Sequence, residues 1–93
     1  MGYPGARSSI IAVLAVKYIV MKLSEIIKQH RKKSGLTQVE FARLAGVGKT
    51  VVFDVEHGKA SVRLDTLLAI LRVLNIKVNL KSPLMGEQSL EVE

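Results

Sequence analysis

The sequence predicts a mainly α-helical domain of four to five helices followed by a C-terminal β-strand. Apolar residues recur at helical spacing between Leu23 and Leu74, and glycines fall at positions where short helices must end. From Ile76 the spacing of apolar residues changes to every second position, which is typical of a half-buried strand. A chain of 93 residues is expected to form one domain, with a modest core that would benefit from oligomerisation.

Composition favours a binder of polyanions. The chain has 14 lysines and arginines against 8 acidic residues, and no basic residue follows Lys81, so residues 1–81 carry 14 basic against 5 acidic side chains. A field of this sign favours nucleic acid and makes binding salt-dependent, although a solvated lysine-rich surface would give the same charge. The absence of cysteine excludes disulfides and thiolate zinc ligands, so we expect a cytoplasmic protein.

Residues 1–20 differ in composition from the rest of the chain, because residues 10–16 are an uninterrupted apolar run, IIAVLAV. The run is shorter than the ~20 residues that span a bilayer, and it lacks the features of a secretory signal. Two interpretations remain open for residues 1–20: a strand that pairs with another segment, or an extension ahead of a true start at Met21.

The first expected helix covers residues 24–33. Ser24 is its expected N-cap, Leu23, Ile27 and His30 are expected to face inward, and Gly35 ends it.

Residues 36–58, LTQVEFARLAGVGKTVVFDVEHG, fit two short helices joined by a tight turn. Thr37 can cap the first helix, and Gly46 stands where that helix must stop. The small side chain of Ala42 allows the two helix axes to approach. The expected inward positions are Phe41, Ala42, Ala45, Val47, Val52 and Val55. This arrangement is how small proteins place a helix into DNA.

The spacing resembles the helix-turn-helix of the lambda-repressor-like (Cro/XRE) family, from about Leu23 to Ile76. The runs GLTQ at residues 35–38, AGVG at 45–48 and LDTLLAILRVLNIKVNL at 64–80 are most similar to antitoxin repressors of the HipB type. The resemblance implies an ion pair between Arg31 and Glu56. It also implies strands that pair across a dimer, and a HipA-like kinase toxin as partner.

The second helix of the unit, residues 49–57, is the expected reader of base edges. Lys49 can donate to guanine, Thr50 can bond a base edge or a phosphate, and Val51 can meet a thymine methyl group. Asp54 either accepts from cytosine or has an orienting role. Gly48 directly precedes this helix and belongs to the expected DNA contact.

Phosphate contacts are expected from Gln38, which opens the first helix of the unit, and from Lys59 and Arg63 in the following loop. The resemblance places this loop along a phosphate strand. The alternative for Gln38 is a role in capping its own helix. Phe53 is expected to be exposed, as a partner contact or as part of a dimer seam.

Leucines 64, 67, 68, 71 and 74 are expected to form the core face of a helix over residues 65–74, with Ile70 and Val73 on another side. Ile76, Val78 and Leu80 alternate with polar residues and predict a dimerisation strand over residues 76–82. Its partner is the same strand of a second chain or the N-terminal run. The expected organisation is therefore an extension (1–20), a helix-turn-helix domain (21–75), the strand (76–82) and an acidic, disordered tail (83–93).

Together these features predict a homodimeric repressor that binds a near-palindromic operator, autoregulates, and serves as the antitoxin of a HipA-like toxin. The alternatives are a phage-type or host regulator without a toxin, and a protein-interaction module that no longer binds DNA. The sequence contains no catalytic constellation and no cluster of metal ligands, so neither an enzyme nor a metal or other cofactor is expected.

Overall fold

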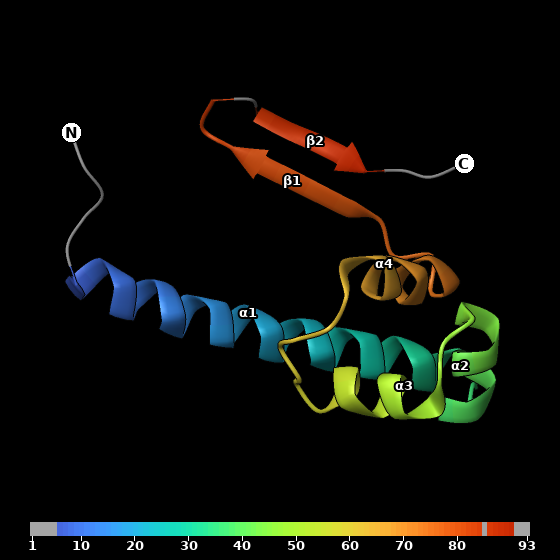
Figure 1. Cartoon of the computed structure of the whole chain (residues 1–93). Helices are drawn as coiled ribbons and strands as arrows, with labels where there is room; N and C mark the ends of the chain where they lie inside the picture. Colours follow the sequence, from blue (N-terminus) through green and yellow to red (C-terminus); the bar gives the residue numbers. More distant parts are fainter. Residues whose placement is uncertain (1–5, 85, 91–93) are drawn as a thin grey trace.

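Four α-helices and a two-stranded antiparallel sheet make up the described chain in a computed structural model that covers residues 6–84 and 86–90. The elements are α1 (Ala6–Lys33), α2 (Gln38–Ala45), α3 (Lys49–Glu56), α4 (Leu64–Val73), β1 (Val78–Ser82) and β2 (Gly86–Leu90). The C-terminal half of α1 packs with the other helices, and its N-terminal half projects away from them (Figure 1). The predicted fold class, mainly α with a C-terminal strand, is confirmed.

Helix α1 differs from the prediction, because it is one continuous helix of 28 residues. Of the two interpretations left open for residues 1–20, the strand is wrong for residues 10–16, which are helical, and the helix start expected at Ser24 is wrong as well. No glycine or proline interrupts residues 6–33, and Ala12, Leu14 and Ala15 are good helix formers, so helix propensity outweighs the β-branched residues of the run. Ser24 lies within the helix, where its Oγ donates to the Val20 carbonyl at 2.9 Å. No break separates residues 1–20 from the rest where the structure describes them.

The other end of α1 agrees better with the sequence. Gly35 follows the helix at φ 74°, a left-handed conformation that glycine adopts at little cost. Ile27 is fully buried as expected. The inward orientation expected for His30 is wrong: its ring is exposed, and Nδ1 lies 2.8 Å from the Ile26 carbonyl oxygen.

The core lies where α1 to α4 meet. Its buried apolar side chains are Ile27, Phe41, Ala42, Val52, Val55, Ile70 and Leu71. Four of the six inward positions predicted between residues 36 and 58 are in this set, and the other two, Ala45 and Val47, are half-buried against it.

Helix α4 is rotated relative to the prediction. Ile70, expected on a second side, is fully buried beside Leu71, while Leu64 and Leu68 are exposed. Apolar residues occupy most of the circumference of this helix, so their spacing alone did not define the inner face. The packing of α4 against α2 defines it.

The strands β1 and β2 form a hairpin within one chain. β1 pairs antiparallel with β2, with Val78 opposite Leu90 and Ser82 opposite Gly86. The prediction that residues 83–93 lack structure is therefore wrong for 86–90, and residues 91–93 lie outside the described chain. The sequence of β2, GEQSL, does not predict a strand, because it has one large apolar residue. Pairing across a dimer remains a prediction.

Among the described residues, no helix combines the length and apolarity needed to cross a membrane.

Candidate nucleic-acid interface

The α2–α3 unit is held by local hydrogen bonds at each end of α2. Thr37 Oγ1 accepts from the Glu40 backbone N–H at 3.1 Å, and Glu40 Oε1 accepts from the Thr37 N–H at 2.8 Å, which completes a capping box. These bonds, the backbone one foremost, lower the pKa of Glu40. Gly46 ends α2 at φ 71°, and the Val47 N–H returns to the Ala42 carbonyl at 2.9 Å. The chain thus turns within three residues and enters α3.

Helix α3 separates a buried face from an exposed one. Val52 and Val55 are buried against the core, while Lys49, Thr50 and Phe53 are exposed. Gly48 is the N-cap and has no side chain, so the first turn of α3 is sterically open. The exposed first turn therefore presents an ammonium group and a hydroxyl at the positive end of the helix dipole.

A buried ion pair fixes α3 to α1. Arg31 Nε donates to Glu56 Oε2, and Arg31 Nη2 donates to Glu56 Oε1 at 3.0 Å. Arg31 Nη1 also donates to the Leu36 carbonyl at 2.8 Å. The pair implied by the resemblance is present, in the bidentate geometry that arginine and carboxylate favour.

Glu56 remains ionised in this site. Burial raises the pKa of its carboxyl, but hydrogen bonds from Arg31 and Gln38, with the charges of Arg31 and Lys28, lower it more, and the net pKa lies below the ordinary value. The Glu56 side chain is 0% exposed, so its charge depends on these partners.

Gln38 has a structural role that sequence reasoning did not foresee. Its Nε2 donates to Glu56 Oε1 at 3.2 Å, so it joins the ion pair instead of capping its own helix by that amide. An amide nitrogen carries two protons, and the bond to Glu56 uses one. A phosphate contact by Gln38 remains a prediction.

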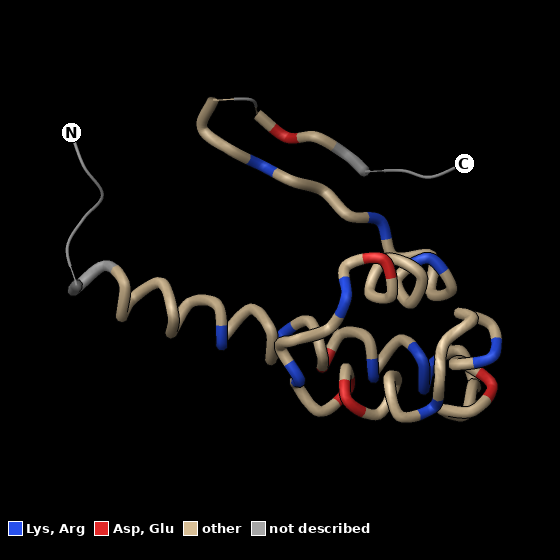
Figure 2. The backbone as a smooth tube through the Cα atoms, viewed as in Figure 1, with Lys and Arg blue, Asp and Glu red and all other residues tan. Residues whose placement is uncertain are grey.

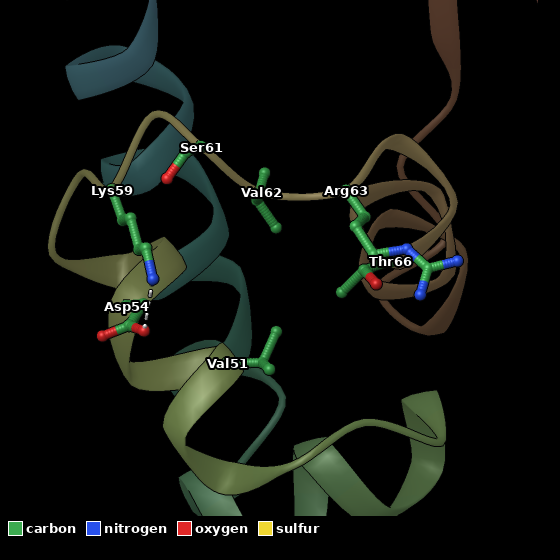
Figure 3. Close-up of a pocket in the computed structure, with 7 residues that line it drawn as sticks. All are labelled: Val51, Asp54, Lys59, Ser61, Val62, Arg63 and Thr66. Atoms are coloured by element: carbon green, nitrogen blue, oxygen red, sulfur yellow. Dashed lines mark hydrogen bonds and ion pairs between the residues drawn. The ribbon is translucent and has the colours of Figure 1, made fainter.

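The loop after α3 returns towards it and encloses an open hollow of about 170 Å³. Figure 3 shows the hollow between α3, the loop and the start of α4. Its lining residues are Val51, Asp54, Lys59, Ser61, Val62, Arg63 and Thr66. The two cations and two hydroxyls in this set suit a phosphate group, whereas the negative charge of Asp54 would repel one.

Both cations of the hollow already have carboxylate neighbours. Lys59 Nζ lies 3.5 Å from Asp54 Oδ2, and Arg63 Nη2 donates to Asp65 Oδ2 at 2.8 Å. Such exposed pairs are weak and readily exchange with a competing anion. The orienting role considered for Asp54 is compatible with this geometry.

Three residues near α3 differ from what the sequence predicted, either in their orientation or because they were not predicted as site residues. Val51 is half-buried and packs on the edge of the core, so less of it faces outward than expected. His57 stacks on Phe53 with ring centroids 3.8 Å apart, and their i,i+4 spacing was the available signal. Thr66 lines the hollow one turn after Arg63.

The described residues contain no group of three potential metal ligands.

Comparison with known proteins agrees with this geometry. The family model HTH_3, described as Helix-turn-helix, matches residues 27–80, more than half of the chain. The "ImmF control region 10 kDa protein" of Bacillus phage phi105 is 34% identical over 58 residues, which are 62% of this chain and 64% of that protein. This chain thus covers less than two thirds of the length of that phage relative.

Two further proteins are similar over most of their own length. The "Uncharacterized HTH-type transcriptional regulator y4mF" of Sinorhizobium fredii is 30% identical over 61 residues, 66% of this chain and 80% of that protein. A chain in the "Structure of HipA-HipB-O2-O3 complex" superposes with a TM-score of 0.63 at 25% identity, covering 69% of this chain and 90% of that one.

Proposed function

Since this chain belongs to the Cro/XRE-type helix-turn-helix family, a family of DNA-binding transcription regulators and not of enzymes, we propose that it binds operator DNA sequence-specifically and represses transcription. The main support for this proposal is the exposed first turn of α3. It presents Lys49 and Thr50 on a helix that the Arg31–Glu56 pair holds in place. A reader helix needs such rigid support, because base readout depends on hydrogen-bond geometry.

In this proposal α3 enters the major groove by its N-terminal end. Lys49 donates to guanine O6 and N7, and Thr50 bonds a neighbouring base edge or phosphate. Val51 offers part of its side chain to a thymine methyl group, and Gly48 lets the DNA approach the helix end closely. Asp54 accepts from cytosine N4 or orients Lys59.

Phosphate contacts flank this helix. Arg63, whose side chain is 81% exposed, and Lys59 would exchange their carboxylate neighbours for phosphate oxygens at the hollow of Figure 3. Gln38 would use its second amide proton on the other side. Such contacts position the protein without reading the sequence.

We also propose that the regulator acts as a homodimer on a near-palindromic operator, with Ile76, Val78 and Leu80 at the interface. β1 has one strand neighbour in the described chain, β2, and in this proposal a strand of another copy pairs with its second edge. Leu80 is 57% exposed and would be covered by such pairing. A two-fold dimer places two reader helices about one DNA turn apart.

The proposed physiological setting is autoregulation together with a HipA-like toxin. Its support is the likeness to a chain in a complex whose title names HipA and HipB. The relative from the phage phi105 control region favours the alternative of a phage-type regulator without a toxin.

Fluorescence anisotropy tests the DNA proposal. The purified protein is titrated onto DNA from upstream of its own gene and onto scrambled DNA of equal length, at two salt concentrations. We expect a preference of ~1000-fold or more for the upstream DNA. The double substitution Lys49→Ala/Thr50→Ala should remove this preference, and Lys17→Ala, on the distant part of α1, should leave it unchanged. Equal binding to both DNAs that vanishes at higher salt would contradict sequence-specific recognition.

A further inference from the structure

The N-terminal half of α1 exposes apolar surface that the rest of the described chain leaves uncovered. We define the α1 extension as residues 9–22. Lys17 and Lys22 are the charged residues of this segment in the sequence, and Figure 2 shows a mostly uncharged chain along the projecting part of α1. Large apolar side chains that are each 53–68% exposed are Ile10, Ile11, Val13, Leu14, Val16, Tyr18, Ile19 and Met21. The segment therefore resembles a buried helix in composition but lies in the open.

The α1 extension exposes more apolar surface than a monomer usually leaves uncovered. At roughly 80 Å² per exposed side chain, eight such residues offer on the order of 600 Å² of apolar surface. A monomer rarely exposes a continuous apolar patch larger than a few hundred Å². Each partner of a stable interface contributes about 800 Å². Counted around the whole helix, the extension comes close to this value, and the side that one partner helix can cover supplies about half of it.

The side of the extension turned away from the core carries a regular seam. Ile11, Leu14, Tyr18 and Met21 follow one another at intervals of three, four and three residues, the spacing by which two helices pack side by side. At 100° per residue, Ile11 lies roughly 160° around the helix from the buried Ile27. The seam ends at Met21, because the next residues on this side, Glu25 and Gln29, are polar and hydrogen-bonded to each other at 2.9 Å.

We propose that the α1 extension is a self-association surface, in which Ile11, Leu14, Tyr18 and Met21 pack against the same seam of a second copy of this chain. The seam contains no charged residue, so the surface that covers it must be apolar as well. A second copy supplies an apolar helix seam of matching length and spacing.

A membrane surface fits the extension less well. A helix that lies in a bilayer interface has one polar face, usually basic, and one apolar face. Lys17 and Lys22 are five positions apart, or about 140° around the helix, so they do not form one basic face. Residues 10–16 are apolar on every side, and the described helices include none that could span a bilayer.

This interface is distinct from the strand edge of β1 and does not depend on the proposed DNA binding. Analytical ultracentrifugation of the full chain over a range of concentrations tests it. The main variant is Leu14→Glu/Tyr18→Glu, and Leu14→Ala/Tyr18→Ala removes the same surface with the strongest helix former. The matched control is Lys32→Glu, on the polar part of the same side of α1. Circular dichroism and thermal unfolding show whether each variant is folded.

The wild-type chain and the Lys32→Glu control should self-associate alike. The glutamate pair should raise the dissociation constant about 100-fold or more, because two apolar contacts are lost and charges are buried in each copy. The alanine pair should raise it in the same direction. Unchanged association in both folded double variants would overturn the proposal, and so would a wild-type chain that stays monomeric.

One monomeric outcome would reassign the surface. If the wild-type monomer floats with vesicles of phosphatidylcholine and phosphatidylglycerol, and the glutamate variant does not, the extension binds lipid and the proposal is overturned. Loss of dimers in Leu80→Glu together with full association in the α1 variants would instead assign dimerisation to β1 alone. Failure of the anisotropy experiment would leave this result untouched, since mass is measured without DNA.

Discussion

Replacing Arg31 by methionine should be among the most destabilising single changes in this chain. The substitution Arg31→Met keeps most of the side-chain volume but removes two hydrogen bonds from Glu56 and leaves that carboxylate, 0% exposed, with Gln38 at 3.2 Å. Breaking a buried ion pair by removing one partner costs about 3–5 kcal/mol. A domain of this size has a total stability of about 5–15 kcal/mol, so the loss is a large part of the whole. The melting temperature should fall by about 15 °C or more.

The companion variant removes both charges. In Arg31→Met combined with Glu56→Met no buried charge is left unpaired, and the remaining loss, from the unmet hydrogen bonds of Gln38 and of the Leu36 carbonyl, should be about 2 kcal/mol. Urea unfolding at neutral pH, followed by circular dichroism, measures both variants. A single variant that costs under 1 kcal/mol, or a double variant that costs as much as the single, would refute this reasoning.

Lowering the pH should reduce the contribution of the Arg31–Glu56 pair to the free energy of unfolding. The folded-state pKa of Glu56 lies below its ordinary value of 4.5, so the folded protein binds fewer protons than the unfolded one in this range. The stabilisation is fully present above about pH 4.5 and is lost as the pH falls through the folded-state pKa. The difference between wild type and Arg31→Met should therefore shrink on acidification. A difference that stays constant down to pH 3 would contradict this.

Three further changes test separate parts of the structure. Arg63→Ala should weaken binding to all DNA sequences alike and lower the slope of log affinity against log salt by about 1, as measured by anisotropy; a sequence-dependent loss would refute the phosphate role. Thr37→Ala should cost about 1 kcal/mol in urea unfolding, because it opens the capping box, and an unchanged midpoint would contradict that role. Val78→Asp should dissociate strand-paired dimers in light scattering, and an unchanged mass would remove this interface.

The helix-turn-helix could be predicted because its signals are local. Gly46 and Thr37 end and begin α2 through bonds within a few residues, and Val52 and Val55 mark the inner side of α3 by spacing alone. The Arg31–Glu56 pair joins distant residues, and the family resemblance supplied it. The part played by Gln38 at this pair depends on how α2 crosses α3, which no local pattern contains.

The errors lie where local patterns are ambiguous. A run of seven apolar residues has no period, so residues 10–16 were compatible with strand and helix. The choice depended on the uninterrupted helix formers around them. In α4, apolar residues on several sides hid the inner face until its packing against α2 was known. β2 depends on backbone pairing with β1 and not on its own side chains.

The continuity of α1 has a mechanical consequence. Its 28 residues form a rod about 42 Å long, and neither a glycine nor a loop separates its projecting end from Arg31. The guanidinium of Arg31 donates to Glu56 near the end of α3, so the orientation of α3 is fixed relative to α1. Inserting one alanine between the projecting end and Ser24 would turn that end by about 100° relative to α3 without altering either surface. The number of residues in α1 between its projecting end and Arg31 therefore sets how a partner bound to that end is oriented relative to α3.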